Sequence, residues 1–136
     1  LGVVLISVPL LPAVRLGLRL RGLRWTAGVL ADRSARTARP VTTEQARPVA
    51  EAVALVAHRP LVGGRCLPRS LVQWFLLRRR GVDAVLVIGA ASPEEGDLSA
   101  HAWVEVCGEP VADAADVRRH FGTFDLTLPR LAAPRS

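Results

Sequence analysis

The stretch 63–81 constrains the fold of this chain more than any other part of the sequence. Two glycines before Cys66 predict a tight loop, and an α-helix is expected from about Leu67, with Pro68 in its first turn, where no backbone donor is needed. The three arginines at 78–80 and then Gly81 suit the negative end of a helix and its cap. The apolar residues recur at spacings of four, three and one and predict a wide buried stripe: Leu67, Leu71, Trp74 and Phe75.

Short strands are predicted after this helix. The run 83–89 is almost continuously apolar and rich in Val and Ile, which is typical of a buried strand. A loop over 90–99 leads to a second strand over 100–106, a turn at Gly108 and a short strand over 110–113. Residues 116–121 can form one helical turn. Helices followed by paired strands indicate an α+β fold, with N-terminal helices packed on a small antiparallel sheet.

Another helix is predicted before the loop at 61–65. Thr42 or Thr43 can cap it, and Pro48 is expected in its first turn or just before its start. It should end before Pro60, because the residue before a proline avoids the helical region. His58, at that end, has no partner visible in the sequence and is expected to have a surface or capping role. The apolar face of this helix comprises Val49, Val53 and Val56.

The N-terminal segment is apolar and basic. Residues 1–14 are too short to span a bilayer and are broken by Pro9 and Pro12, so a packed segment is favoured over contact with a membrane surface. Residues 12–25 predict an amphipathic helix with a narrow apolar stripe that covers the core, although 15–21 also alternate as a strand would. Residues 27–41 show no period and are interpreted as a linker. The stripe is Leu16, Leu20 and Leu23, and its flanks carry Arg15, Arg19, Arg21 and Arg24.

Charge and composition limit the function classes. The chain has 136 residues, consistent with one domain, and its 18 basic and 12 acidic residues give a net charge of +6. Such a balance suggests acidic partners, and the four arginines are expected to dock a partner protein or an anionic membrane. No nucleic-acid motif and no phosphate loop occur, so neither nucleic acid nor a nucleotide cofactor is expected. The two cysteines form no disulfide framework, and too few ligands are suitably spaced to bind a metal.

Three residues have the chemistry of a cysteine-nucleophile triad: Cys66 at a helix start, His101 on a strand and Asp113 on the next strand. The reactive form of a cysteine is the thiolate, which helix N-termini and nearby imidazolium groups stabilise. Backbone amides at a helix start can also hold the oxyanion formed on acyl attack. Taken singly, Cys66 can equally be a buried structural cysteine and His101 a satisfied strand histidine. A reactive thiol must stay reduced, which favours the cytoplasm.

The length of the turn between the last two predicted strands decides whether Asp113 can lie on the same face of the sheet as His101. A two-residue hairpin at 107–108 would place Asp113 on the opposite face from His101, whereas a three-residue loop over 106–108 would set the two directly opposite each other. The longer loop also sets Glu105 against Glu109, an unfavourable pair. The turn chemistry therefore permits the triad without requiring it. Asp116 is the alternative carboxylate, and Cys107 is interpreted as a bystander.

At these residues the sequence resembles the lasso peptide leader peptidase, the stand-alone maturation protease half of the split lasso B protein, of the transglutaminase-like superfamily. The resemblance covers about 49–121 and rests on these segments: CLPRSL at 66–71, LRRRG at 77–81, HAWVEV at 101–106, Asp113, and the pair Asp116-Val117. It implies a transglutaminase-like or papain-like cysteine protease fold. It also implies that Cys66 is the nucleophile, His101 the general base and Asp113 the orienting acid.

The resemblance further implies a function and its partners. Members of this family remove the leader from a ribosomally made precursor peptide, which a separate leader-binding protein presents, before a separate ATP-using cyclase closes the macrolactam ring. The expected organisation is a helical, Arg-rich segment with a linker at 1–45, a catalytic core at 46–128 and a loose tail at 129–136. A transglutaminase-like acyltransferase or amidase, and a non-catalytic partner-binding domain, are the alternatives. The expected location is the cytoplasm, with membrane contact through the N-terminal segment left open.

Overall fold

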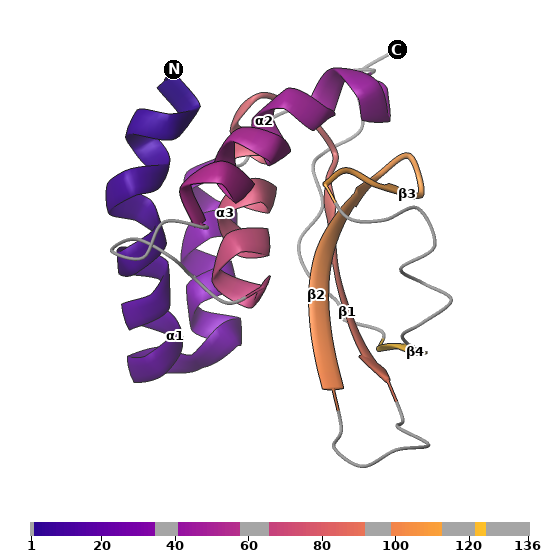
Figure 1. The fold of residues 1–136 in the computed structure, drawn as a ribbon. Helices are drawn as coiled ribbons and strands as arrows, with labels where there is room; N and C mark the ends of the chain where they lie inside the picture. Colours follow the sequence, from indigo (N-terminus) through magenta and orange to yellow (C-terminus); the bar gives the residue numbers. More distant parts are fainter. Residues whose placement is uncertain (1, 35–40, 58–65, 92–98, 113–121, 125–136) are drawn as a thin grey trace.

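A computed structural model describes residues 2–34, 41–57, 66–91, 99–112 and 122–124. Within these residues the helices form one layer and an antiparallel sheet forms the other (Figure 1). The expected α+β fold is confirmed. The predicted turn at 116–121, the tail at 129–136 and His58 lie outside the described residues. The elements in chain order are α1 Gly2–Ser34, α2 Thr43–Ala57, α3 Cys66–Arg79, β1 Val85–Ala91, β2 Ser99–Val106, β3 Glu109–Pro110 and β4 Gly122–Phe124.

Helix α1 consists of two arms joined by a sharp bend. Gly22 has φ 84° and ψ 178°, a backbone conformation that only glycine adopts readily. The first arm, residues 2–21, and the second arm, residues 23–34, run side by side in Figure 1. A Cβ on Gly17 would lie 3.0 Å from Thr26 Oγ1, so a glycine there permits the close approach of the two arms. Among the described residues, no helix is long and apolar enough to cross a membrane.

Two predictions for this segment are wrong. The linker expected over 27–41 is helical as far as Ser34, because Ala27, Leu30 and Ala31 are buried in the core and that packing outweighs the weak helical pattern. The stripe containing Leu16 and Leu20 does not cover the core: these side chains are 57% and 71% exposed. The first arm is apolar on nearly every side, so its sequence did not identify the buried face, which carries Ser7, Leu11 and Val14.

Helix α2 begins with a capping box. Thr42 Oγ1 accepts a hydrogen bond from the Gln45 amide at 3.2 Å, and Gln45 Oε1 accepts one from the Thr42 amide at 3.0 Å. The predicted cap at Thr42 is confirmed. Pro48, however, is the sixth residue of the helix, so its predicted place in the first turn is wrong. A proline there removes one hydrogen bond of the second turn, while burial of Ala46, Ala50 and Val53 holds the helix against its neighbours.

Helix α3 is the centre of the molecule. It begins at Cys66, has Pro68 in its first turn and is capped by Gly81 at φ 78°, as predicted. The cap is a Schellman motif, because the Gly81 amide donates to Arg78 O and the Val82 amide to Leu77 O. Helices α1 and α2 and the sheet all contact α3, so its residues 70–78 are buried on every side.

Arg78 has a different role from the predicted one of complementing the helix end. It is 2% exposed, and its Nε donates to Ser34 Oγ at the end of α1 (3.0 Å). Its guanidinium lies over the Trp74 ring, 4.9 Å from the centroid. Burial lowers the pKa of Arg78, and the charge of Asp83 partly opposes this effect. Arg78 thus joins α3 to α1 through the core.

The sheet has the strand order β3-β2-β1-β4. Leu86 and Val104, which pair across β1 and β2, join the core beneath the helices. Val87 and Trp103, which also pair, form a second cluster. Each is next in sequence to a core residue of its strand, Leu86 or Val104, and successive side chains alternate, so this cluster lies on the other face of the sheet. Strand β4, which pairs with β1, had not been predicted. The central position of β2 determines where the candidate site lies.

Candidate active site

Cys66 is the first residue of α3, and its side chain is half-buried. Both Cys66 and Cys107 carry free thiols. The first amides of a helix have no carbonyl partner within it, so they are available to an anion near the helix start. The predicted position of Cys66 at a helix N-terminus is confirmed.

His101 is the third residue of β2 and lies opposite Gly89 of β1. Its ring stacks on that of Trp103, with the centroids 5.8 Å apart and the planes inclined by 23°. Trp103 Nε1 in turn donates to Glu105 Oε2 at 2.8 Å. The three side chains therefore share one face of the strand, as predicted from the alternation. Trp103 is fully buried, so it gives the His101 ring that stacks on it a fixed support.

A hydrogen bond from Ser70 joins the start of α3 to this part of β2. Ser70 Oγ donates to Ala102 O at 2.9 Å, and the serine is fully buried. The carbonyl of Val104, two residues along β2, accepts from the Val111 amide at 3.0 Å. Carbonyls two residues apart point to the same edge of a strand. Ser70 and Val111 therefore bind the same edge of β2, Ser70 at Ala102 and Val111 at Val104.

This bond joins the helix that begins at Cys66 to the strand that carries His101. Cys66 precedes Ser70 by four residues and lies on the same helix face, about 6 Å further along the axis. His101 adjoins the carbonyl that Ser70 binds. Ser70 was not among the site residues expected from the sequence. The one signal that could have identified it is a serine within an otherwise apolar helix stripe.

The hairpin after β2 has two residues in its loop, Cys107 and Gly108, with φ 54° and 78°. The observed pairs are Glu105 with Pro110 and Val106 with Glu109, so the three-residue loop that would have set His101 opposite Asp113 is wrong. Positive φ at both loop residues is typical of the tight turn that matches strand twist. The observed register also avoids pairing Glu105 with Glu109.

The orienting acid is therefore not identified by the hairpin. Both Asp113 and Asp116 lie outside the described residues, and the ladder of β2 with β3 ends at Pro110. Asp113 stays a prediction, supported by the resemblance alone. Among the described residues no group of three potential ligands could hold a metal ion.

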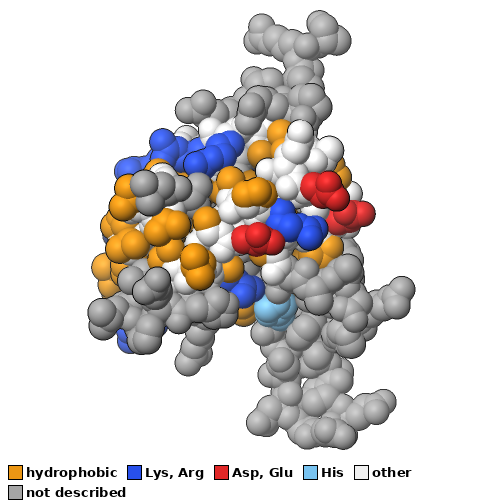
Figure 2. All heavy atoms as spheres, turned by 45° about the horizontal axis from the view of Figure 1, so that its top comes forward, with side chains coloured by type: hydrophobic (Ala, Val, Ile, Leu, Met, Phe, Trp, Pro, Cys, Tyr) orange, Lys and Arg blue, Asp and Glu red, His pale blue; other side chains and the backbone are white. Residues whose placement is uncertain are grey.

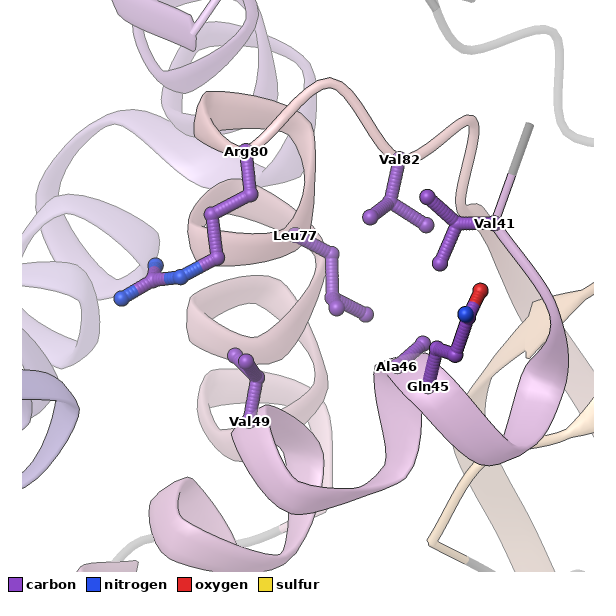
Figure 3. A pocket seen from close by; sticks show the side chains of 7 residues that line it. All are labelled: Val41, Gln45, Ala46, Val49, Leu77, Arg80 and Val82. Atoms are coloured by element: carbon purple, nitrogen blue, oxygen red, sulfur yellow. The ribbon is translucent and has the colours of Figure 1, made fainter. Parts of the chain in front are cut away.

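A cavity of about 460 Å³ lies at the other end of α3 (Figure 3). Side chains from α2, from α3 and from the segment after α3 converge on it, among them Val49, Leu77 and Val82. Leu77 follows Cys66 by eleven residues, which is about 16 Å along a helix axis. The cavity is therefore separate from the Cys66 and His101 site.

A thiol at the start of a central helix and a histidine on an antiparallel strand bonded to that helix are residue types that cysteine enzymes use to transfer acyl groups. The family model of the transglutaminase-like superfamily matches residues 10–124, and the chain belongs to this superfamily. A cysteine protease or acyltransferase type of activity fits this membership. No curated protein and no solved structure matched the chain.

Proposed function

We propose that the chain is a cysteine endopeptidase that removes the leader from a ribosomally made lasso precursor peptide. The observation that supports it best is the Ser70 bond, which joins the helix that begins at Cys66 to the carbonyl of Ala102, the neighbour of His101 in β2. The sequence around both residues, CLPRSL and HAWVEV, supports the choice of leader peptidase within the superfamily. In this proposal a separate leader-binding protein presents the precursor, and a separate cyclase closes the ring in the cytoplasm.

The proposed reaction proceeds through a thioester. Cys66 Sγ attacks the scissile carbonyl carbon while His101 accepts the thiol proton, and amides at the start of α3 stabilise the oxyanion. His101 then gives the proton to the leaving amine as the peptide bond breaks. A water molecule, deprotonated by His101, hydrolyses the thioester, which releases the carboxylate and restores the thiol. Asp113 is proposed to hold the imidazole in the orientation that these transfers need.

Replacing each cysteine in turn tests the nucleophile. We expect Cys66→Ala to fold and to leave the precursor uncut, because no other residue in the proposal supplies the thiolate. Cys107→Ala is the matched control and should cleave nearly normally, since Cys107 is exposed in the hairpin loop. Mass spectrometry of a precursor incubated with the enzyme and the leader-binding protein gives the readout. Cleavage by Cys66→Ala together with its loss in Cys107→Ala would contradict the assignment.

The same assay separates hydrolysis from acyl transfer. In heavy-oxygen water a peptidase places the label in the new carboxylate of the leader. An acyltransferase or amidase would instead give a product that carries an added amine or has lost only a side-chain amide. An intact precursor with an added amine would contradict the proposed peptidase and retain the superfamily chemistry.

A further inference from the structure

The outward side of α1 is apolar and open to solvent. Among the side chains whose exposure the structure describes, Leu55 of α2 is the single large exposed apolar one outside α1. Figure 2 shows the apolar side chains gathered on the side of the molecule where α1 lies in Figure 1, with basic side chains at their border. The large exposed side chains of α1 are Leu5, Ile6, Val8, Leu16, Leu20 and Trp25.

Helical spacing arranges part of this surface as a continuous line. Five exposed residues recur at spacings of four, three, four and four, which places them on one face of the first arm. That face lies opposite the buried side chains of Ser7, Leu11 and Val14 and is about 22 Å long. Soluble chains seldom leave such a surface without a use. These five residues, Leu5, Pro9, Pro12, Leu16 and Leu20, are called the outer stripe below.

The charges around the outer stripe are of one sign. Arg15 and Arg19 are exposed beside it, Arg21 and Arg24 follow at the bend, and residues 1–31 contain no acidic residue. The Arg21 guanidinium lies 5.5 Å from the centroid of the half-exposed Trp25 ring. A surface of this composition is complementary to an apolar phase bordered by negative charge.

An apolar groove opens next to the outer stripe. It has a volume of about 310 Å³ and lies between the two arms, with Phe75 of α3 among its lining residues. Ala13 and Gly17 line it from the first arm, and Trp25 and Val29 from the second. Ala13 is exposed and precedes Gly17 by one turn of the same arm, so the groove adds to the apolar area of the outer stripe.

We propose that the outer stripe and its arginines bind the surface of an anionic phospholipid bilayer. An interfacial helix has this composition, with apolar side chains below the headgroups and arginines that reach the phosphates. Trp25 lies near the bend, where an aromatic ring can occupy the headgroup layer. A second copy of the chain is a poorer occupant, because packing two outer stripes together would bring arginines of both copies close to one another.

Tryptophan fluorescence tests this proposal on the intact chain. Trp25 is 48% exposed, whereas Trp74 and Trp103 are 1% and 0% exposed, so a change of emission on binding reports Trp25. We expect a blue shift and co-sedimentation with vesicles of phosphatidylcholine and phosphatidylglycerol, and neither with phosphatidylcholine alone. Raising the salt concentration should weaken binding, since it screens charges at the surface. Trp25→Phe should remove the shift while the protein still sediments.

Paired variants separate the outer stripe from general stickiness. The double change Leu16→Ser and Leu20→Ser should weaken vesicle binding by at least about tenfold, because it removes two large apolar side chains from the interface. The double change Arg15→Gln and Arg19→Gln should weaken it by a factor on the order of ten. The controls on α2, Leu55→Ser and Arg47→Gln, each change one exposed residue of the same type outside the outer stripe and should leave binding almost unchanged.

Three results would overturn the proposal. The first is a wild-type chain that fails to sediment with anionic vesicles at low salt. The second is equal loss of binding in the α2 controls. The third is a concentration-dependent dimer, or a complex with the leader-binding protein, that the leucine variants abolish while the vesicles bind nothing, which would assign the outer stripe to a protein. None of these measurements depends on peptidase activity, so the proposed function is tested separately.

Discussion

At the scale of single residues, Ser70 links the helix that begins at Cys66 to the strand that carries His101. Removing its hydroxyl leaves the carbonyl of Ala102 without the donor that it has in the core. We expect Ser70→Ala to lower the free energy of unfolding by about 1–3 kcal/mol. The rate of precursor cleavage should fall by more than this stability loss explains, because α3 is then less firmly held against the strand that carries His101.

Thr43→Ala is the matched control for Ser70→Ala. Thr43 Oγ1 donates to Val106 O at 2.7 Å, so it too joins a helix to a buried carbonyl of β2 by one hydroxyl. Urea unfolding should show a similar loss of stability in both variants, whereas kcat/KM should fall in Ser70→Ala alone. Equal kcat/KM in the two variants would show that Ser70 serves stability and does not position the site.

Which carboxylate orients His101, Asp113 or Asp116, is a second question at residue scale. If Asp113 orients His101, Asp113→Asn should lower the cleavage rate by orders of magnitude, because the neutral amide no longer stabilises the imidazolium. Asp116→Asn should lower it much less. Circular dichroism of both variants checks that they are folded. A larger loss in Asp116→Asn would make Asp116 the orienting acid, an outcome that the two-residue hairpin leaves open.

The sequence predicted the local features of these residues better than their distant partners. The helix start at Cys66, the shared face of His101 and Trp103 and the cap at Gly81 follow from spacing and from glycine chemistry. The Ser70 bond to Ala102 and the Arg78 bond to Ser34 join residues 32 and 44 positions apart. Local periodicity carries no information about such contacts, which depend on how the elements pack.

At the scale of elements, the bend in α1 rests on one glycine. Gly22 has a positive φ, and a side chain there would be strained even though no atom lies within 4 Å of an added Cβ. We expect Gly22→Ala to destabilise the protein by about 1–3 kcal/mol.

Gly28→Ala makes the same chemical change inside the second arm, at ordinary helical φ and with no atom within 4 Å of the added Cβ. It should stabilise the protein by about 0.5–1 kcal/mol, because alanine loses less backbone freedom on folding. Thermal unfolding of the two variants gives the comparison. A lower midpoint for Gly28→Ala, or an unchanged one for Gly22→Ala, would contradict the bend described here.

Prediction of the elements failed where packing outweighs local pattern. Residues 27–34 have no clear period and are nonetheless helical, because α3 offers them an apolar surface. The hairpin loop has the shorter of the two lengths that the sequence left open, because Cys107 takes a positive φ that sequence preference assigns mainly to glycine. In both places the preference of a few residues was weaker than the contacts of the whole element.

At the scale of the whole molecule, the sequence suggested a boundary between residues 45 and 46, yet α1 and α3 share one hydrophobic core. Phe75 of α3 lines the groove between the arms of α1, and Arg78 donates to Ser34. The family match also begins at residue 10, within the first arm. These observations raise the question of whether the catalytic residues can fold without α1.

Deleting residues 1–41 answers this question. Burial of Leu11, Val14 and Leu30 alone contributes roughly 4.5 to 9 kcal/mol by the usual value for a buried side chain. This is comparable with the entire stability of a small domain, about 5–15 kcal/mol. We therefore expect the shortened chain to show no cooperative thermal transition. Deleting residues 129–136, the tail predicted to be loose, is the control and should leave the transition in place. A shortened chain that unfolds cooperatively and whose Cys66 is still alkylated at the rate of the full chain would establish a core, residues 42–136, that folds without α1.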